Sequence, residues 1–464
     1  MNSLLNAPGR LARRLLPRQR AATAATVAPP AFAVPATAIA TLPDPGALRH
    51  TLLRLIAQAE RRIVIVALYL QDDDGGREVL EALHAAKARC PALRVSVYVD
   101  WHRARRGLIG QAHSEGNAGM YRELAQRLGD GVEIRGVPVQ SRELLGVLHL
   151  KGWVIDDTVL YTGASLNDVY LARHGRYRLD RYHQLQHRGL ADTLVGLVDR
   201  QFAASPAVPR LDALPLPSTR ELLPAIRELR QALLAASYAA PDEALQQGEV
   251  AVTPILGLGR HDNALNATVL ALLESARRRV VLFTPYFNLP RPVRAAVGQA
   301  LRRGCRVEIM VGDKTANDFY IPPDRPFSTI GVLPYLYENN LRRFAQAHTR
   351  QLASGQLTLW LWRHDGNSYH LKGLFVDADT ALLTGHNLNP RAWSLDLENG
   401  LLLRDPAQHL AAMHEAEWTA LRRHARRLAS YRELDTLRDY PPDVRRLLRR
   451  LSRVRLDRLV NRLL

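Results

Sequence analysis

The chain has 464 residues, 47% of them hydrophobic, which is enough on length alone for more than one domain core. Sixty-three lysines and arginines against 45 acidic residues give a formal net charge of +18, which indicates an anionic partner: a phospholipid surface, a nucleotide or a nucleic acid. Two cysteines, Cys90 and Cys305, exclude a disulfide framework and suit a reducing compartment. The chain contains no run of about 18 consecutive apolar residues, so no transmembrane helix is predicted.

Residues 1–45 are predicted to form a basic, disordered tail. Five arginines lie between Arg10 and Arg20, and the first acidic residue is Asp44. An Ala-, Pro- and Thr-rich stretch follows the arginines. A targeting peptide is the alternative, but the prolines at 29, 30 and 35 interrupt any apolar core.

The rest of the chain repeats one order of elements. An apolar run over 61–70 predicts a buried strand, and a helix over 77–89 and a strand over 93–99 complete a βαβ unit. The same order recurs in the run 278–287, the helix 291–303 and the strand 306–311. The sequence therefore predicts an α/β fold of two halves, 46–202 and 251–410, each a mostly parallel sheet covered by helices. A Pro-rich and then helical connector is expected over 203–250, and basic helices over 411–464.

A short His-x-Lys motif occurs once in each half. His149 and Lys151 form the first copy, and His370 and Lys372 form the second. Because alternate side chains of a strand share a face, the imidazole and the ammonium of each copy are predicted to point the same way. For either copy alone, a core histidine beside a strand-edge lysine is an equal alternative, but chance does not account for two copies with matching flanks.

Further polar residues follow each copy at matching positions. Asp156 and Asp377 come after four intervening residues, and Asp156 has the opposite parity, which favours a structural anchor over a reacting group. A Gly-rich turn then leads to two polar side chains predicted to share a face of the next strand. These are Ser165 and Asn167 in the first half, and Asn387 and Asn389 in the second.

Two carboxylates are candidates for a position behind a histidine. Glu398 is the one predicted to fix the tautomer of a catalytic imidazole through a hydrogen bond. Asp180 is its weaker analogue in the first half, and for Asp180 a surface ion pair is an equal alternative.

Imidazole, ammonium and carboxamide groups that converge suit attack at phosphorus. The imidazole can add covalently, the lysine offsets charge on the non-bridging oxygens, and the amide donates hydrogen bonds as that charge develops. No acidic cluster with metal-ligand spacing accompanies these residues, so neither a metal nor another cofactor is expected. Neither set is complete alone, and the two halves are therefore predicted to pack face to face around one site.

The C-terminal residues 443–464 are predicted to form a basic amphipathic helix. Val444, Leu447, Leu448, Leu451 and Val454 share one arc, with Arg445, Arg446, Arg449, Arg450 and Arg453 opposite. Such a helix can lie on anionic lipid, each arginine near the surface contributing about 1 kcal/mol. A terminal helix docked on the body with its arginines in solvent is an equal alternative.

The paired motifs resemble the phospholipase D superfamily, whose two halves share one active site. Within it, residues 146–152, 163–170, 312–322 and 387–393 are similar to bacterial phosphatidyltransferases that use serine as acceptor, and the similarity runs from about residue 46 to Leu464. The resemblance implies transfer of a phosphatidyl group from CDP-diacylglycerol to L-serine with release of CMP. It also implies a cytoplasmic protein that binds the inner membrane reversibly.

The resemblance also implies roles for individual residues. His149 would be the nucleophile that forms a phosphatidyl-enzyme and His370 the general acid/base, although the sequence alone does not decide which histidine attacks. The set expected to be catalytic is His149, Lys151, Asp156, Asn167, His370, Lys372, Asp377, Asn389 and Glu398. The set expected to contact substrate is Ser165, Asp180, Lys314, Asn317 and Asn387.

Other members of the superfamily define the alternatives. A nuclease would use the same motifs, but nucleic acid is not expected as the substrate, because aromatic residues make up only 6% of the chain and are not interleaved with the basic runs. A cardiolipin synthase would be expected to carry amino-terminal membrane spans. A phospholipase is a further possibility, and the oligomeric state is not readable from the sequence.

Overall fold

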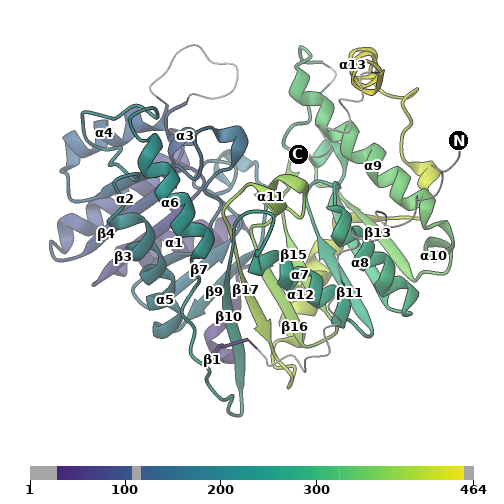
Figure 1. Cartoon of the computed structure of the whole chain (residues 1–464), viewed down its shortest axis with the longest axis horizontal. Coiled ribbons are helices and arrows are strands. Elements are labelled where there is room, and N and C mark those ends of the chain that lie inside the picture. Colours follow the sequence, from purple (N-terminus) through teal and green to yellow (C-terminus); the bar gives the residue numbers. More distant parts are fainter. Residues whose placement is uncertain (1–28, 107–115, 323, 454–464) are drawn as a thin grey trace, which may run out of the picture.

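A computed structural model of the chain describes residues 29–106, 116–322 and 324–453. These residues form two α/β halves that lie side by side, the first coloured purple to teal and the second green to yellow (Figure 1). Each half is built on its own large sheet. The fold class predicted from the duplicated order of elements is confirmed.

Among the described residues, the first half contains a seven-stranded sheet. Its order is β2 (Ile39–Thr41), β9 (Tyr182–Gln186), β7 (Thr158–Thr162), β6 (Trp153–Ile155), β3 (Arg62–Ala67), β4 (Arg94–Asp100) and β5 (Glu133–Val137). The helices α1 (Pro45–Gln58), α2 (Asp74–Arg89) and α4 (Asn117–Leu128) form one packed group, in which α2 contacts both of the others. The short α3 (Trp101–Ala104) follows β4, and α5 (Arg188–Val198) contacts β6 and β7.

The second half contains a nine-stranded sheet within the same described ranges. Its order is β1 (Phe32–Pro35), β10 (Glu249–Gly257), β17 (Glu398–Arg404), β16 (Thr380–Thr384), β15 (Gly373–Val376), β11 (Arg279–Phe283), β12 (Arg306–Gly312), β13 (Leu357–Trp362) and β18 (Ala425–Leu428). Five helices contact this sheet or one another: α7 (Ala264–Ser275), α8 (Arg291–Arg302), α9 (Leu333–Ala347), α10 (Thr349–Ala353) and α12 (Ala411–Arg422).

The sheets differ from the prediction in strand direction. Only β3–β4–β5 and β11–β12–β13 are parallel, and the remaining neighbours in both large sheets are antiparallel. The physical reason is the length of the connections. Helical crossovers link β3 to β4 and β11 to β12, whereas two- and three-residue turns join β6 to β7 and β15 to β16, and such short turns allow only antiparallel pairing.

Part of the predicted disordered tail is ordered. β1 pairs with β10 of the second half, and β2, only a few residues later, pairs with β9 of the first. Asp44 then caps α1 by accepting the backbone N–H of Ala47 at 2.8 Å. Residues 32–45 therefore link the two sheets, which corrects the expectation of disorder for that stretch, while residues 1–28 lie outside the described part.

A helix lies in the connector before the second half, and another lies at the C-terminal end of the described chain. Within the connector 203–250, α6 (Leu223–Ala235) forms after the Pro-rich stretch, as the expectation of a Pro-rich and then helical segment stated. At the C-terminus, α13 (Pro442–Arg453) buries Val444 and Leu448 in a cluster with Tyr335 and Tyr440, while Arg446 is exposed. The described part of this helix is thus docked on the body, and residues 454–464, which complete the predicted helix, lie outside the described part.

The hydrophobic core runs from one half into the other. One contiguous cluster includes Val64 and Val97 of the first sheet together with Phe283 and Leu401 of the second. The two halves therefore pack as one body, with the seam between them partly apolar. In the described ranges no helix is both long and apolar enough to cross a bilayer.

Candidate active site

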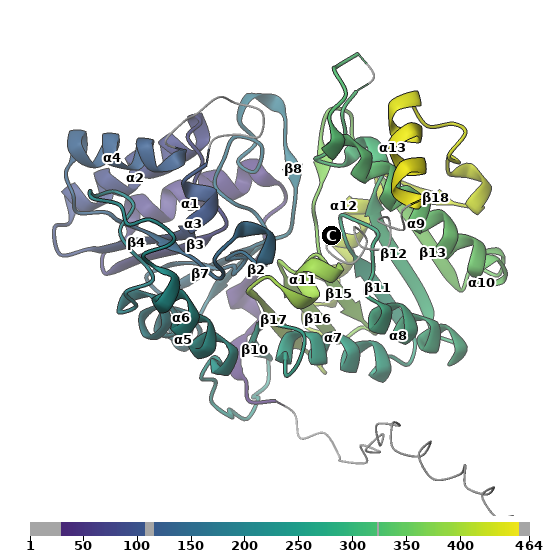
Figure 2. The ribbon, with the colours of Figure 1, turned by 45° about the horizontal axis from the view of Figure 1, so that its top comes forward.

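Both His-x-Lys segments lie at the seam, and each is paired with the other half. Leu148 forms a parallel bridge with Leu397, and the backbone N–H of His149 donates to the carbonyl of Leu397 at 2.9 Å. In the second half, β14 (Ser368–Tyr369) pairs with β8 (Arg178–Leu179), and the N–H of His370 donates to Leu179 at 2.8 Å. Figure 2 shows β8 on the side of the first half that faces the second.

The motifs precede their strands, whereas the sequence predicted them inside the strands. β6 begins after Gly152, and β15 begins at Gly373. Both glycines have positive φ angles, 117° and 124°, which side chains rarely adopt. The bend at each glycine turns the extended His-x-Lys segment out of its own sheet, so that it pairs with the opposite half.

His149 is buried against a carboxylate from the other half. Its Nδ1 lies 2.8 Å from Oε2 and 2.9 Å from Oε1 of Glu398, the first residue of β17. Burial, followed by the charges of Lys151 and Lys372, holds the pKa of His149 well below its ordinary value. Burial raises the pKa of Glu398 well above its ordinary value, but in its ionised form this carboxylate can only accept, which places the imidazole proton on Nδ1 and leaves the Nε2 lone pair available for reaction.

His370 has the reciprocal arrangement with a denser set of partners. Its Nδ1 lies 3.3 Å from Oδ2 of Asp180 and 2.9 Å from the hydroxyl of Tyr170, both in the first half. The Nζ of Lys372 is also within hydrogen-bonding distance of this Nδ1 and lies 2.8 Å from Asp180 Oδ2. Burial, then the charge of Lys372, lowers the pKa of His370 to about 4.

The two lysines differ in whether their charge is matched. Lys372 is fully buried and ion-paired with Asp180. Burial opposes ionisation of Asp180, but the Lys372 ammonium and His370 together lower its pKa to about 2. Lys151 is 3% exposed, and its Nζ has no hydrogen-bond partner in the described part of the chain. Burial and then repulsion from Lys372 lower the pKa of Lys151 to about 8.

Two residues next to the carboxylates hold the backbone of the lysines, and neither was predicted from the sequence. Asn399 accepts the N–H of Lys151 and donates to its carbonyl, both at 2.8 Å. Arg181 donates to the carbonyl of Lys372 at 3.3 Å and forms an ion pair with Glu417. Their only signal in the sequence is position, since each directly follows a predicted carboxylate.

Asp156 and Asp377 act as anchors of the fold. Each has a positive φ and lies in the turn after the strand that follows its motif. Asp156 accepts the backbone N–H groups of residues 60, 61 and 62, and Asp377 accepts those of residues 277, 278 and 279. These contacts hold the loop ahead of β3 and of β11, and neither carboxylate contacts a motif histidine or lysine. The expectation of an anchoring role for Asp156 agrees with this geometry.

The Gly-rich turns are loops, and the sequence predicted strands there. β7 ends at Thr162 and β16 ends at Thr384, so the predicted amides lie just beyond them. Asn167 donates to Gln71 at 3.1 Å, and its carbonyl oxygen accepts the N–H of Tyr170 at 3.1 Å. Asn389 caps α11 (Pro390–Ser394) by accepting the N–H of Ala392 at 2.9 Å.

The remaining residues of the turns are Ser165 in the first half, and Asn387 and its neighbour His386 in the second. Ser165 is 2% exposed, and the carbonyl oxygen of the Asn387 side chain is buried without a partner among the described residues. His386 is fully buried, its Nδ1 accepts the N–H of Leu388 at 2.9 Å, and its Nε2 has no partner within the same ranges. Burial lowers the pKa of His386 to about 3, so the ring is a neutral donor through Nε2. His386 was not among the residues predicted from the sequence.

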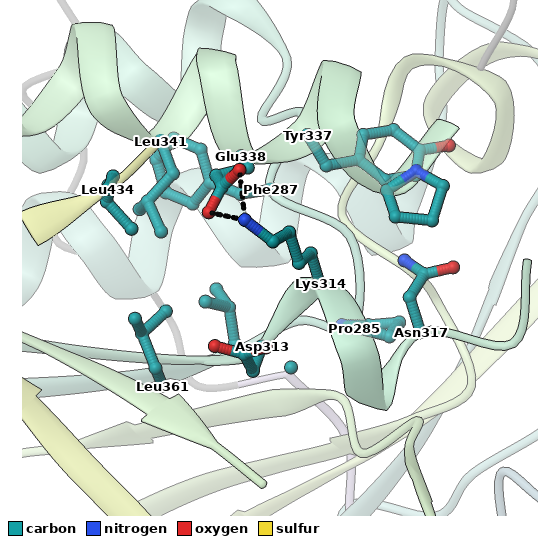
Figure 3. Close-up of a pocket in the computed structure, with 13 residues that line it drawn as sticks. Pro285, Phe287, Asp313, Lys314, Asn317, Tyr337, Glu338, Leu341, Leu361 and Leu434 are labelled. Carbon is teal, nitrogen blue, oxygen red and sulfur yellow. Dashed lines mark hydrogen bonds and ion pairs between the residues drawn. The ribbon is translucent and has the colours of Figure 1, made fainter. Parts of the chain in front are cut away.

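Lys314 and Asn317 line a different pocket, shown in Figure 3. The Nζ of Lys314 lies 3.1 Å from both carboxylate oxygens of Glu338 and also pairs with Asp435. The Asn317 side chain accepts the N–H of Phe319 at 2.9 Å. Because two carboxylates already match the lysine charge, this geometry does not favour the expected substrate contact by Lys314.

The assembled site can bind and transfer a phosphoryl group. Two neutral imidazoles each have a free Nε2 in the described structure, and an unpaired ammonium and a buried N–H donor accompany them. Lys372 and His370 influence the pKa of His149 through their charges, so the two sets lie within electrostatic range of one another. Within the described residues no group of His, Cys, Asp or Glu side chains is placed to hold a metal ion.

Two halves that each contribute a His-x-Lys set to one buried seam define a phospholipase D-type protein. A family profile described as "Cardiolipin synthase, PLD-like domain" matches residues 269–418, which include the second motif. The CDP-diacylglycerol–serine O-phosphatidyltransferase of Escherichia coli strain K12 is 49% identical over 421 residues, covering 90% of this chain and 93% of that protein. The chain belongs to the CDP-diacylglycerol–serine O-phosphatidyltransferase family.

A second relative and a solved structure agree. The Haemophilus influenzae protein of the same name is 44% identical over 439 residues, covering 94% of this chain and 96% of that protein. The crystal structure of phosphatidylserine synthase from Haemophilus influenzae superposes with a TM-score of 0.91 at 44% identity, covering 94% of this chain and 97% of that one. The predicted fold, two phospholipase D-like α/β halves packed together, is thus confirmed.

Proposed function

We propose that the chain transfers a phosphatidyl group from CDP-diacylglycerol to L-serine through a phosphatidyl-histidine, releasing CMP. The observation that carries this proposal is the buried ammonium of Lys151, which has no partner in the described structure and accompanies two neutral imidazoles. A bound anion would stabilise this buried charge, and the phosphate of a diester would place such an anion next to the nucleophile.

The partners of the two rings support different roles for them. His149 Nδ1 faces only carboxylate oxygens, which favours the tautomer with a free Nε2 lone pair. His370 Nδ1 faces Asp180, which can only accept, as well as Lys372, which can only donate, so its partners fit a ring that takes up and gives back a proton. His149 is therefore the better nucleophile and His370 the better acid/base residue.

The reaction then has two balanced steps. In the first, Nε2 of His149 forms a bond to phosphorus and the bond from phosphorus to the CMP oxygen breaks, so that CMP leaves as a phosphate anion. In the second, the serine hydroxyl gives its proton to Nε2 of His370, its oxygen bonds to phosphorus, and the bond to His149 breaks. The proton then passes from His370 to solvent. Lys151 offsets the charge on the non-bridging oxygens in both steps.

The test uses labelled CDP-diacylglycerol with serine, glycerol or water as the acceptor. Phosphatidylserine formed with serine, and little product with glycerol or water, supports the proposal. Mass spectrometry in the absence of serine should detect a lipid-linked imidazole on His149, and a His149→Ala variant should lack it. Efficient transfer to glycerol or water, or a covalent lipid retained by His149→Ala, would contradict it.

We further propose that the enzyme binds anionic membranes reversibly at the cytoplasmic face, through the arginine face of α13. Val444 and Leu448 are buried in the body, so the arginines at 446, 449 and 450 are the groups left for lipid phosphates. Binding to vesicles should strengthen with anionic lipid and weaken steeply with salt. Salt-insensitive binding, or unchanged binding after replacement of these arginines by glutamine, would contradict this attachment.

A further inference from the structure

A carboxylate beside His370 has one oxygen that the fold leaves unpaired. Asp318 lies in the loop after the short turn Lys314–Ala316, and its side chain is 10% exposed. Oδ2 accepts the hydroxyl of Tyr286 at 2.8 Å. Oδ1 is buried and has no hydrogen-bond partner in the described part of the chain. A buried anionic oxygen without a donor is costly, and a ligand that supplies a donor removes that cost.

Tyr286 connects this carboxylate to the acid/base residue. Its ring centroid lies 5.7 Å from that of His370, and its hydroxyl bonds Asp318. The charge of Asp318 acts to raise the pKa of both His370 and Lys372, against the stronger effect of burial. Asp318 is thus about one tyrosine ring away from the imidazole that must take a proton from the acceptor.

A cation from the first half lies near the same carboxylate oxygen that accepts the Tyr286 hydroxyl. Nη2 of Arg178 in β8 is 3.5 Å from Asp318 Oδ2, and Nε donates to Ser368 at 3.4 Å. The guanidinium lies over the ring of Tyr170, 5.0 Å from its centroid, and the hydroxyl of Tyr170 bonds His370. The single long contact to Asp318 is not the bidentate fork that arginine and carboxylate form when they satisfy each other.

We propose that Asp318 and Arg178 form the subsite that recognises the amino-acid end of the serine acceptor. Oδ1 of Asp318 receives the α-ammonium, the guanidinium of Arg178 receives the α-carboxylate, and the hydroxyl then reaches Nε2 of His370. One anion and one cation match a zwitterion whose net charge is zero. This inference rests on serine being the acceptor, as proposed above.

The subsite explains how one acceptor is chosen among small hydroxyl compounds. Ethanolamine lacks the carboxylate and leaves Arg178 without its ligand, whereas 3-hydroxypropionate lacks the ammonium and leaves Asp318 Oδ1 unpaired. Glycerol and water supply neither group. A site built on buried polar groups rejects analogues that leave those groups unpaired more strongly than an apolar pocket rejects a missing methylene.

The experiment separates acceptor binding from formation of the phosphatidyl-enzyme. Asp318→Asn keeps the shape and an acceptor for Tyr286, and Arg178→Gln removes the charge. We expect each to raise KM for serine by about 10- to 100-fold, the loss of a hydrogen bond to a charged group. Serine-independent release of CMP in a single turnover should stay within about twofold, which also shows that the variants fold.

Matched controls and acceptor analogues make the result specific. Asp365→Asn and Arg176→Gln, which change exposed residues, should behave as the parent enzyme. Arg178→Gln should reduce the preference for serine over ethanolamine. Asp318→Asn should reduce the preference for serine over 3-hydroxypropionate. Unchanged KM for serine, or loss of CMP release in step with loss of transfer, would overturn the subsite. A parent enzyme that releases CMP but makes no phosphatidylserine would instead overturn the proposed function.

Discussion

Nδ1 of His149 in the first half lies 2.8 Å from the carboxylate of Glu398 in the second. The reciprocal contact, from His370 to Asp180, crosses the seam in the opposite direction at 3.3 Å. Each half therefore supplies the imidazole of one set and the carboxylate that orients the imidazole of the other. A half expressed alone would have a histidine whose tautomer nothing fixes, so the duplicated halves depend on each other chemically as well as in packing.

Glu398→Gln should slow phosphatidyl transfer by roughly 10²- to 10⁴-fold, a typical effect of disabling proton chemistry at a catalytic group. The amide can donate to Nδ1, which favours the tautomer whose Nε2 carries the proton and cannot attack. Single-turnover CMP release measures the effect, with KM for CDP-diacylglycerol little changed. Glu415→Gln, at an exposed ion pair, is the control. A normal burst from Glu398→Gln would exclude this role.

Asp180→Asn should destabilise the fold by about 3–5 kcal/mol, because it leaves the fully buried ammonium of Lys372 without a counter-charge. Urea denaturation at pH 7 measures the change. The double variant Asp180→Asn with Lys372→Met should recover part of the loss, since it removes the unpaired charge as well. Losses that simply add in the double variant would show that the two groups are not coupled.

Activity should fall on the alkaline side near pH 8. Burial and Lys372 lower the pKa of Lys151 to about 8, so the free enzyme loses this ammonium as the pH rises through that value. A bound phosphate stabilises the ammonium and raises its pKa again. The alkaline limb should therefore appear in kcat/KM for CDP-diacylglycerol and shift upward in kcat. Identical limbs in both profiles would contradict a phosphate contact at Lys151.

His370→Ala should slow transfer to serine more than release of CMP. CMP departs as a phosphate, a good leaving group that depends little on acid catalysis, whereas the serine hydroxyl is a poor nucleophile until a base takes its proton. Rapid-quench measurements should therefore show a CMP burst followed by slow turnover. Absence of the burst would show that His370 is needed in the first step as well.

The sequence predicted which residues meet at the seam better than it predicted how they pair across it. Periodicity and repetition were sufficient to predict β3, α2, β11 and α8, and the two His-x-Lys sets. Glu398 and Asp180 were predicted to lie behind a histidine, but which histidine each contacts was not predicted. That assignment depends on pairing between segments more than 180 residues apart, such as His370 with Leu179, for which no local pattern exists.

Short elements were missed for the same reason. β1 and β2 have four and three residues, and they follow an arginine- and proline-rich stretch that has the composition of a disordered tail. These two strands are ordered because β1 pairs with β10 and β2 pairs with β9. The pairing partners are 142 or more residues away in the sequence. The prediction of mostly parallel sheets was wrong because it assumed helical crossovers throughout each half. Such crossovers connect only the first strands, and tight turns connect the later ones.

His386 supplies the last prediction. Its Nδ1 is occupied by the N–H of Leu388, which fixes the proton on Nε2, a buried donor with no acceptor in the described structure. The adjoining Gly385 lies against the methylenes of Lys151, so this donor is close to the proposed phosphate position. His386→Leu should lower kcat/KM for CDP-diacylglycerol about tenfold, the value of one hydrogen bond to a charged oxygen. His386→Asn, which keeps an N–H donor, should lose less, and equal kinetics for Leu, Asn and the parent would show that His386 does not contact the substrate.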